Sequence, residues 1–210
     1  MLSVPYRWSA FRAASIAAVA ILAMVLVAWQ FGLFSLNERG SGIRGNAKIG
    51  GSFDLLDHNG KPRTNADFRG QFMLIYFGYS YCPDVCPTAL QIMSTALQFL
   101  GKKATSIQPI FITVDPKRDT QEHLKDYVKN FYPGMVALTG TEDLIKEAAK
   151  KYRIYFSKAS QDKTQSNSDD YLIDHSSIVF LMGRDGQYIT HFNHQTNAEA
   201  MAKIIAKQLR

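Results

Sequence analysis

Hydrophobic and polar positions along the chain change their period several times, and each change predicts a different element. The runs 73–78 and 110–114 are almost entirely apolar, which is typical of strands buried on both faces of a sheet. Leu90, Met93 and Leu97 recur at the spacing of one helical face. On such patterns we expect strands at 53–56, 73–78, 110–114, 136–138, 177–182 and 188–192, and helices at 87–100, 120–131, 141–152 and 197–209.

The order of these elements predicts a mixed α/β sheet. Strands alternate with helices over the first two thirds of the domain, and a hairpin with its turn at 183–186 and a final helix close the chain. Helices that alternate with strands pack against a central sheet. A second turn is expected at 57–61 and a polar loop at 159–170. The order strand, cysteine loop, helix, strand, helix, hairpin, helix is that of a thioredoxin-like domain with insertions.

The N-terminal part of the chain has a different composition. No charged residue lies between Arg12 and Glu38, and 13–34 consists mainly of aliphatic residues, methionine and phenylalanine. A run of this length is enough to cross a bilayer core of about 30 Å, and it is longer than the apolar region of a cleaved signal peptide. We therefore expect an N-terminal tail (1–12), an uncleaved transmembrane helix (13–34), a flexible glycine-rich linker (35–48) and one compact domain (49–210).

The net charge of +6 arises mostly near the N-terminus. Residues 1–48 hold five lysines and arginines and one glutamate, which leaves only +2 for the rest of the chain. The basic residues flank both ends of the predicted anchor, so they do not fix its orientation. No basic stripe with interleaved aromatic residues is present, and we expect no binding to nucleic acid.

The two cysteines of the chain, Cys82 and Cys86, follow the predicted strand 73–78. A disulfide that closes so short a loop removes little entropy from the unfolded chain, so the pair indicates redox chemistry or soft-metal binding. Each cysteine precedes a proline, which favours an extended backbone, and Pro87 suits the first residue of a helix. We expect Cys86 at the N-cap of that helix, where the dipole would stabilise a thiolate.

A third donor is expected from the segment 171–177. Thioredoxin-like oxidoreductases bring a cis-proline against the cysteine pair at this place, and this chain has no proline after Pro133. His175 stands there instead, and an imidazole would turn a redox pair into a metal site. Asp174 or a backbone carbonyl would orient its other ring nitrogen. A histidine that is merely hydrogen-bonded in a loop is the competing interpretation.

The other histidines carry weaker signals. His58 lies in a predicted turn and His123 in the first turn of a predicted helix. His191 and His194 have the spacing of a metal-binding pair, but no third donor lies near them in the sequence. We therefore interpret all four as ordinary structural or surface residues.

Four more side chains are expected near the cysteines. Asp115 ends the strand next to the cysteine strand, where α/β sheets place ligands. It would either tune the site or cap a turn, and we favour the turn. Asp84 would add charge to the pocket or to a docking face. Tyr79 and Tyr81 are interpreted as shielding walls of the pocket.

The segment 76–87, YFGYSYCPDVCP, resembles the signature of the Sco/SenC family of membrane-anchored copper proteins. Many members have Thr-His before the first cysteine, where this chain has Ser80-Tyr81. The resemblance implies a thioredoxin-like fold and one copper ion held by Cys82, Cys86 and His175. Further similar motifs follow the family order: DFRG at 67–70, VDPKRDT at 114–120, LTG at 138–140 and DHSS at 174–177.

The resemblance also implies a function. Family members take part in assembling the dinuclear copper centre of cytochrome c oxidase, so the partners would be the copper-bearing oxidase subunit and a copper donor or thiol reductant. The protein would span the inner membrane once, with its domain in the periplasm or the mitochondrial intermembrane space. A metallochaperone for Cu(I), with Cu(II) as a second state, is our first hypothesis.

The alternative hypothesis is a thiol–disulfide oxidoreductase that reduces the client's cysteines before copper is delivered. It needs Cys82 and Cys86 but not His175, and only under this hypothesis would the protein be an enzyme. A peroxiredoxin-like peroxidase fits the expected fold, but no residue pattern marks a peroxide pocket.

Overall fold

A computed structural model describes residues 16–17, 19–24, 27, 49–159 and 171–209. The chain divides into two compact units, Met1–Asn46 and Ala47–Arg210.

In the first unit, the described residues 16–17, 19–24 and 27 are helical. The predicted tail 1–12, the linker 35–48 and the rest of the predicted anchor lie outside the described residues. Over the described ranges, no helix is both long enough and apolar enough to span a membrane.

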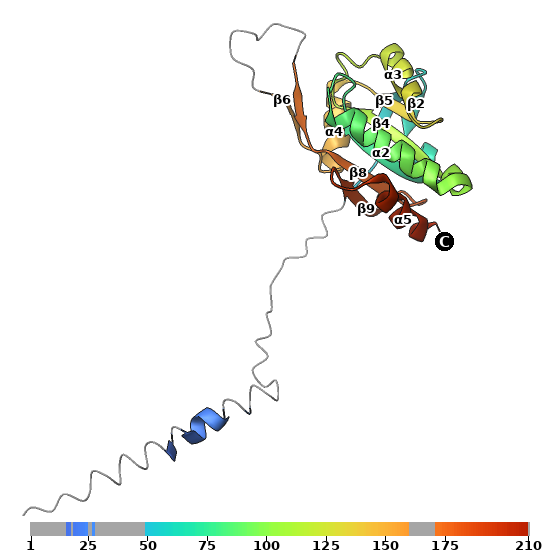
Figure 1. Ribbon diagram of the computed structural model, residues 1–210. Helices are drawn as coiled ribbons and strands as arrows, with labels where there is room; N and C mark the ends of the chain where they lie inside the picture. The colour runs from blue at the N-terminus through green and yellow to red at the C-terminus, as the bar shows by residue number, and fades with distance from the viewer. Residues whose placement is uncertain (1–15, 18, 25–26, 28–48, 160–170, 210) are drawn as a thin grey trace, which may run out of the picture. The chain divides into compact units, whose positions relative to one another are not determined.

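A seven-stranded mixed sheet forms the centre of the second unit (Figure 1). Its strands lie in the order β2-β1-β5-β4-β3-β8-β9. β3 pairs in parallel with β4, and β4 with β5, whereas the other pairings in this sheet are antiparallel. The strands are β1 (Asp54–Asp57), β2 (Pro62–Thr64), β3 (Phe72–Gly78), β4 (Ile107–Thr113), β5 (Val136–Thr139), β8 (Ile178–Met182) and β9 (Tyr188–Asn193).

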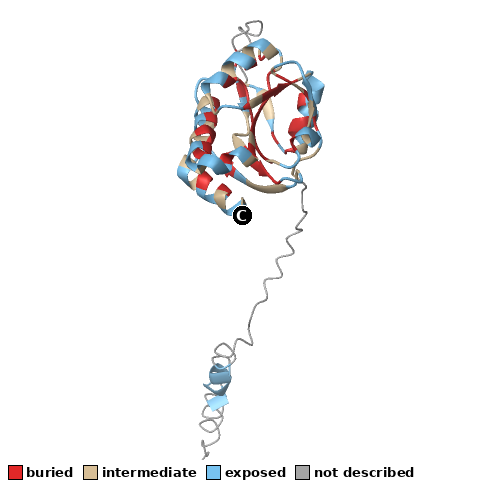
Figure 2. Cartoon of the chain, turned by 90° about the vertical axis from the view of Figure 1, so that its right-hand side faces the viewer, coloured by how far each residue is buried: buried red, intermediate tan, exposed pale blue. Residues whose placement is uncertain are grey.

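Four helices of the second unit accompany this sheet; three lie between strands along the chain, and the fourth follows the last strand. Figure 2 shows that buried residues gather on the central strands and on the inward faces of the helices. α2 and α5 pack against each other, and α4 contacts β1. The helices are α2 (Val85–Leu100), α3 (Gln121–Tyr127), α4 (Glu142–Lys151) and α5 (Ala198–Gln208), with short 3₁₀ helices η1 (Asn65–Phe68), η2 (Gly101–Ser106) and η3 (Val128–Asn130).

The central strand β3 positions the cysteine loop. All seven of its residues are buried, which confirms the prediction from its unbroken apolar run. It pairs with β4 from Phe72↔Ile107 to Gly78↔Thr113, so both strands end at the same edge of the sheet. The residues that follow them, including the cysteines, therefore meet at that edge.

Helix starts agree with three predictions and differ in one. The side chains of Thr120, Thr141 and Asn197 each cap a helix by accepting a backbone N–H. α2 begins earlier than predicted, at Val85, so the expectation that Cys86 is its N-cap is wrong. Pro87 still lies in the first turn, where its missing N–H costs no intrahelical bond.

A small second sheet was not predicted from the sequence. β6 (Phe156–Lys158) and β7 (Ile173–His175) form a two-stranded antiparallel ladder outside the main sheet. His175 is paired with Phe156 in this ladder. The predicted loop 159–170 thus lies between β6 and β7 along the chain.

Gly78 at the end of β3 leaves space for the second cysteine. A Cβ at this position would lie 2.8 Å from Cys86 Sγ and 2.8 Å from Tyr76 Cε1. We expect Gly78→Ala to lower the free energy of unfolding by about 1–3 kcal/mol through overpacking. Gly140→Ala is the control, because the nearest atom to its added Cβ would be the end of a leucine side chain at 3.1 Å. Equal losses in urea denaturation of the two variants would contradict this account.

Candidate metal centre

The sulfur of Cys82 lies at the N-terminus of α2. The Cys86 N–H donates to Cys82 Sγ over 3.4 Å. Asp84 is the N-cap residue, but its side chain makes no capping bond and instead accepts from the Thr88 hydroxyl. The first N–H groups of a helix have no intrahelical partner, so a sulfur in this place satisfies one of them and is favoured as a thiolate.

The two thiols have opposite electrostatic environments. Burial on its own raises the pKa of Cys82, but hydrogen bonds from the backbone of Asp84 and Cys86 outweigh it, and the pKa lies below its ordinary value. Cys86 is fully buried, and desolvation raises its pKa strongly. The expectation of a Cys86 thiolate is therefore wrong. Because α2 begins before Cys86, the helix N-terminus stabilises the Cys82 thiolate instead.

His175 presents one ring nitrogen to the cysteines. Its Nε2 lies 3.2 Å from Cys86 Sγ, and its Nδ1 lies 3.3 Å from the carbonyl oxygen of Ser176. A carbonyl only accepts, so Nδ1 carries the proton and Nε2 keeps its lone pair. Burial lowers the pKa of His175, which favours the neutral ring. Either Asp174 or a backbone carbonyl was predicted to orient the ring, and in the structure it is the carbonyl of Ser176.

Cys82, Cys86 and His175 form one candidate metal site. Their ligand atoms all lie within 4.8 Å of one another, and both cysteines are free thiols. Two sulfurs and one imidazole suit a soft ion such as Cu(I). A structural zinc site has four protein ligands, and the group found here has three. Over the described part of the chain, no other group of three such side chains comes together.

Two tyrosines enclose the imidazole. The rings of Tyr76 and Tyr79 meet His175 edge-on, at centroid distances of 6.0 and 5.9 Å. The Tyr76 hydroxyl lies 3.2 Å from Ser177 Oγ. Tyr79 thus occupies the wall position that we expected. Tyr81 is half-exposed and stacks on His123, so it lies at the rim rather than in a wall.

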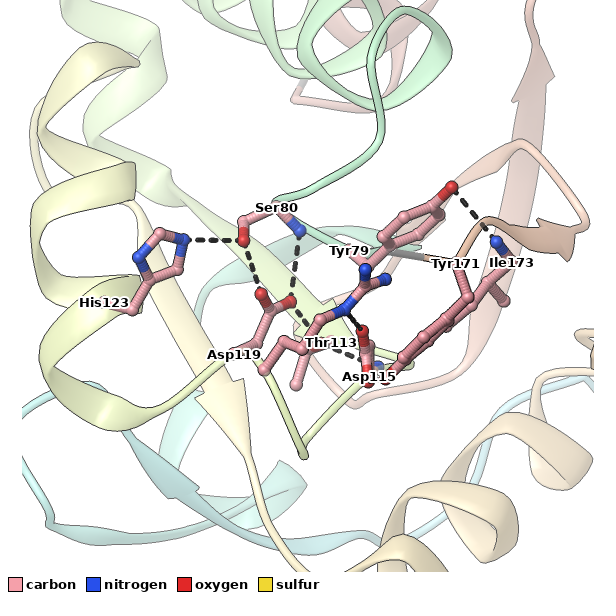
Figure 3. A network of polar contacts seen from close by, with 9 residues as sticks. Tyr79, Ser80, Thr113, Asp115, Asp119, His123, Tyr171 and Ile173 are labelled. Atoms are coloured by element: carbon pink, nitrogen blue, oxygen red, sulfur yellow. Dashed lines mark hydrogen bonds and ion pairs between the residues drawn. The ribbon is translucent and has the colours of Figure 1, made fainter. Parts of the chain in front are cut away.

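A buried polar network holds the loop that leads to Cys82 (Figure 3). Asp119 accepts the Ser80 N–H over 3.1 Å and the Thr113 hydroxyl over 2.5 Å, and it also accepts the Ser80 hydroxyl. His123 Nε2 lies 2.8 Å from Ser80 Oγ. Burial raises the pKa of Asp119. The one sequence signal of this network is the VDPKRDT motif, which contains Asp119, and no role of Asp119 was predicted from it.

Asp115 does not join the metal group. Its carboxylate forms an ion pair with Arg118 and accepts the Tyr171 hydroxyl over 2.7 Å. Its backbone carbonyl accepts the Asp119 N–H over 2.9 Å, in agreement with the predicted turn. The Arg118 guanidinium lies over the ring of Tyr171 at 3.6 Å and over that of Tyr81 at 4.8 Å. Asp115 therefore links the loop after β4 to the chain that leads into β7.

The remaining predicted side chains are not members of the three-residue ligand group. His58 Nδ1 accepts the Ala137 N–H over 3.1 Å. His191 is bonded to the Tyr188 hydroxyl, and His194 and Asp84 are exposed. The interpretation of these histidines as structural or surface residues agrees with these positions.

The two thiols should differ in reactivity. At neutral pH we expect Cys82 to react with iodoacetamide at least about ten times faster than Cys86, because it is the more exposed thiol and the one with the lowered pKa. Labelling rates of Cys86→Ser and Cys82→Ser, each with one thiol, measure the difference. Lowering the pH should slow the labelling of Cys82, because protonation removes its thiolate. Faster labelling of Cys86 would contradict the assignment.

Comparison with known proteins gives a consistent result. The SCO1/SenC family model matches residues 41–210. An SCO2-like protein of Rickettsia prowazekii is 40% identical over 161 residues, 77% of each chain, and the mitochondrial SCO1 homolog of Mus musculus is 39% identical over 168 residues, 79% of this chain and 58% of the mouse protein. The copper-bound structure of ScoI from Bradyrhizobium japonicum superposes with a TM-score of 0.68 at 39% identity, covering 76% of this chain and 98% of that one.

Proposed function

This chain belongs to the SCO1/SenC family, and on that premise we propose that it is a copper chaperone for cytochrome c oxidase assembly that binds copper through Cys82, Cys86 and His175. The observation that carries the proposal is the convergence of these three ligand atoms within 4.8 Å. The copper-bound structure of the B. japonicum relative supports the choice of metal.

The geometry suggests an order of events. Cys82 is partly exposed and has the lowered pKa, so its thiolate meets an incoming Cu(I) first. Cys86 is buried and must lose its proton before it can bind. His175 completes the site with Nε2, which needs no proton loss. Release of copper follows the reverse order. His175 leaves first, Cys86 then regains a proton, and a thiolate of the partner finally replaces Cys82 at the exposed side.

Location and partners follow from the same proposal. The apolar run 13–34 would anchor the protein in the inner membrane, with the domain in the periplasm or the intermembrane space. The family has bacterial and mitochondrial members. A tether along 35–48 raises the effective concentration of the copper site near a membrane-bound partner. The partner that we propose is the copper-bearing subunit of the oxidase.

Copper titration tests the three-ligand site. Under anaerobic conditions we expect a single tight Cu(I) site, tight binding lost in Cys82→Ser and in Cys86→Ser, and affinity reduced at least about tenfold in His175→Ala. Competition with a chromophoric Cu(I) chelator measures the affinity. His191→Ala is the control, because that histidine lies on the edge strand β9 and its side chain is bonded to Tyr188. A His175→Ala protein that binds as tightly as wild type would refute the site.

A second function uses the same cysteines. A partly exposed thiol with a lowered pKa beside a buried thiol with a raised pKa is the arrangement of a nucleophile and a resolving cysteine. The Cys82 thiolate would attack a client disulfide and release one client thiolate. Deprotonated Cys86 would then attack Cys82 and release the second. The client gains two electrons, the protein holds a Cys82–Cys86 disulfide, and a thiol reductant restores it.

Expressing the variants in cells distinguishes copper delivery from thiol–disulfide exchange. If copper delivery is the role, His175→Ala should lose oxidase activity to nearly the extent of Cys82→Ser when each replaces the native protein, because both variants lose a copper ligand. The measurement is cytochrome c oxidase activity in membranes, with immunoblots to confirm equal protein levels. Full activity in His175→Ala together with none in Cys82→Ser would assign the protein to thiol–disulfide exchange.

A further inference from the structure

We propose that Tyr79 is a positioning residue for His175, because it ties the strand that carries this histidine to the cysteine loop. The inference rests on the proposed copper site and adds a residue to it. Tyr79 is the first residue after β3, and its side chain is buried.

The strand that carries His175 has little support of its own. β7 has three residues and, within the described part of the chain, pairs only with the three residues of β6, outside the main sheet. An isolated two-stranded ladder is at best marginally stable in water. The position of His175 therefore depends on contacts between this ladder and the rest of the domain.

Tyr79 supplies such a contact from the cysteine loop. Figure 3 shows its hydroxyl directed at the backbone nitrogen of Ile173, and the Ile173 N–H donates to it over 3.1 Å. Alternate residues of a strand share a face, so Ile173 and His175 lie on the same side of β7. The Tyr79 ring itself meets the imidazole edge-on at 5.9 Å.

The same residue contacts the cysteines through its backbone. The Tyr79 carbonyl accepts the Cys82 N–H over 3.3 Å. One buried residue therefore joins the loop of the first cysteine to the strand of the histidine. Its two hydrogen bonds fix the distance between the two parts of the ligand set before any metal is bound.

A second anchor of the ladder lies farther from the imidazole. The Tyr171 hydroxyl donates to Asp115 over 2.7 Å, two residues before Ile173. This bond holds the start of the segment, and it reaches the cysteine loop only through Arg118, which pairs with Asp115 and lies over the ring of Tyr79 at 5.7 Å. Tyr79 bonds the strand of His175 and meets the imidazole itself, so its loss should act on His175 most directly.

The test removes the hydroxyl and keeps the ring. Tyr79→Phe should weaken Cu(I) binding about 2- to 10-fold, the range expected for one neutral hydrogen bond, because the ladder must then be ordered when the metal binds. Chelator competition measures the affinity, and amide hydrogen exchange should become faster at Ile173. The control is Tyr188→Phe, which removes a tyrosine hydroxyl bond to His191 on β9 and should leave both readouts unchanged.

A double-mutant cycle separates positioning from a general structural effect. If Tyr79 acts through His175, the Tyr79→Phe change should cost much less copper affinity in a His175→Ala background than in wild type. The same loss in both backgrounds, or no loss in wild type, would overturn the inference. Failure of His175→Ala to weaken copper binding at all would instead refute the proposed three-ligand site. Urea midpoints confirm that each variant is folded.

Discussion

The hydrogen bond from the Cys86 N–H to the sulfur of Cys82 is the contact on which the candidate site depends. It places one sulfur where the N–H groups of α2 stabilise negative charge, and it leaves the other sulfur inside the core. The difference between the two thiols follows from this single placement. A partly exposed thiolate and a buried thiol then have separate tasks in either copper binding or disulfide exchange.

The sheet and the polar network fix the positions of the two cysteines. β3 ends at Gly78, whose lack of a side chain admits the buried sulfur of Cys86. Asp119 then holds Ser80, so the chain between the strand and Cys82 is fixed at a second point. A fully buried carboxylate is costly unless its hydrogen bonds are satisfied, and here three donors satisfy it. The polar network therefore positions the cysteine loop without contributing a ligand.

The sequence predicted the parts that leave a local pattern. The buried strand β3 follows from its unbroken apolar run, and Cys82, Cys86 and His175 from rare residue types and a missing proline. It did not predict the ladder of β6 and β7 or the role of Asp119, because both depend on contacts between distant segments. The roles of the two cysteines were reversed by a small error in the start of α2, since element boundaries are the least certain part of such a prediction.

Because His175 lies outside the main sheet, the free energy needed to displace it differs from the free energy needed to displace Cys86. Cys86 lies in α2 and is buried against the end of β3, so displacing it requires opening of the hydrophobic core. His175 is held by a ladder of three-residue strands, which can open as a local unit while the core stays folded. The histidine ligand can therefore leave and return on the timescale of a local fluctuation, and copper exchange need not wait for global unfolding.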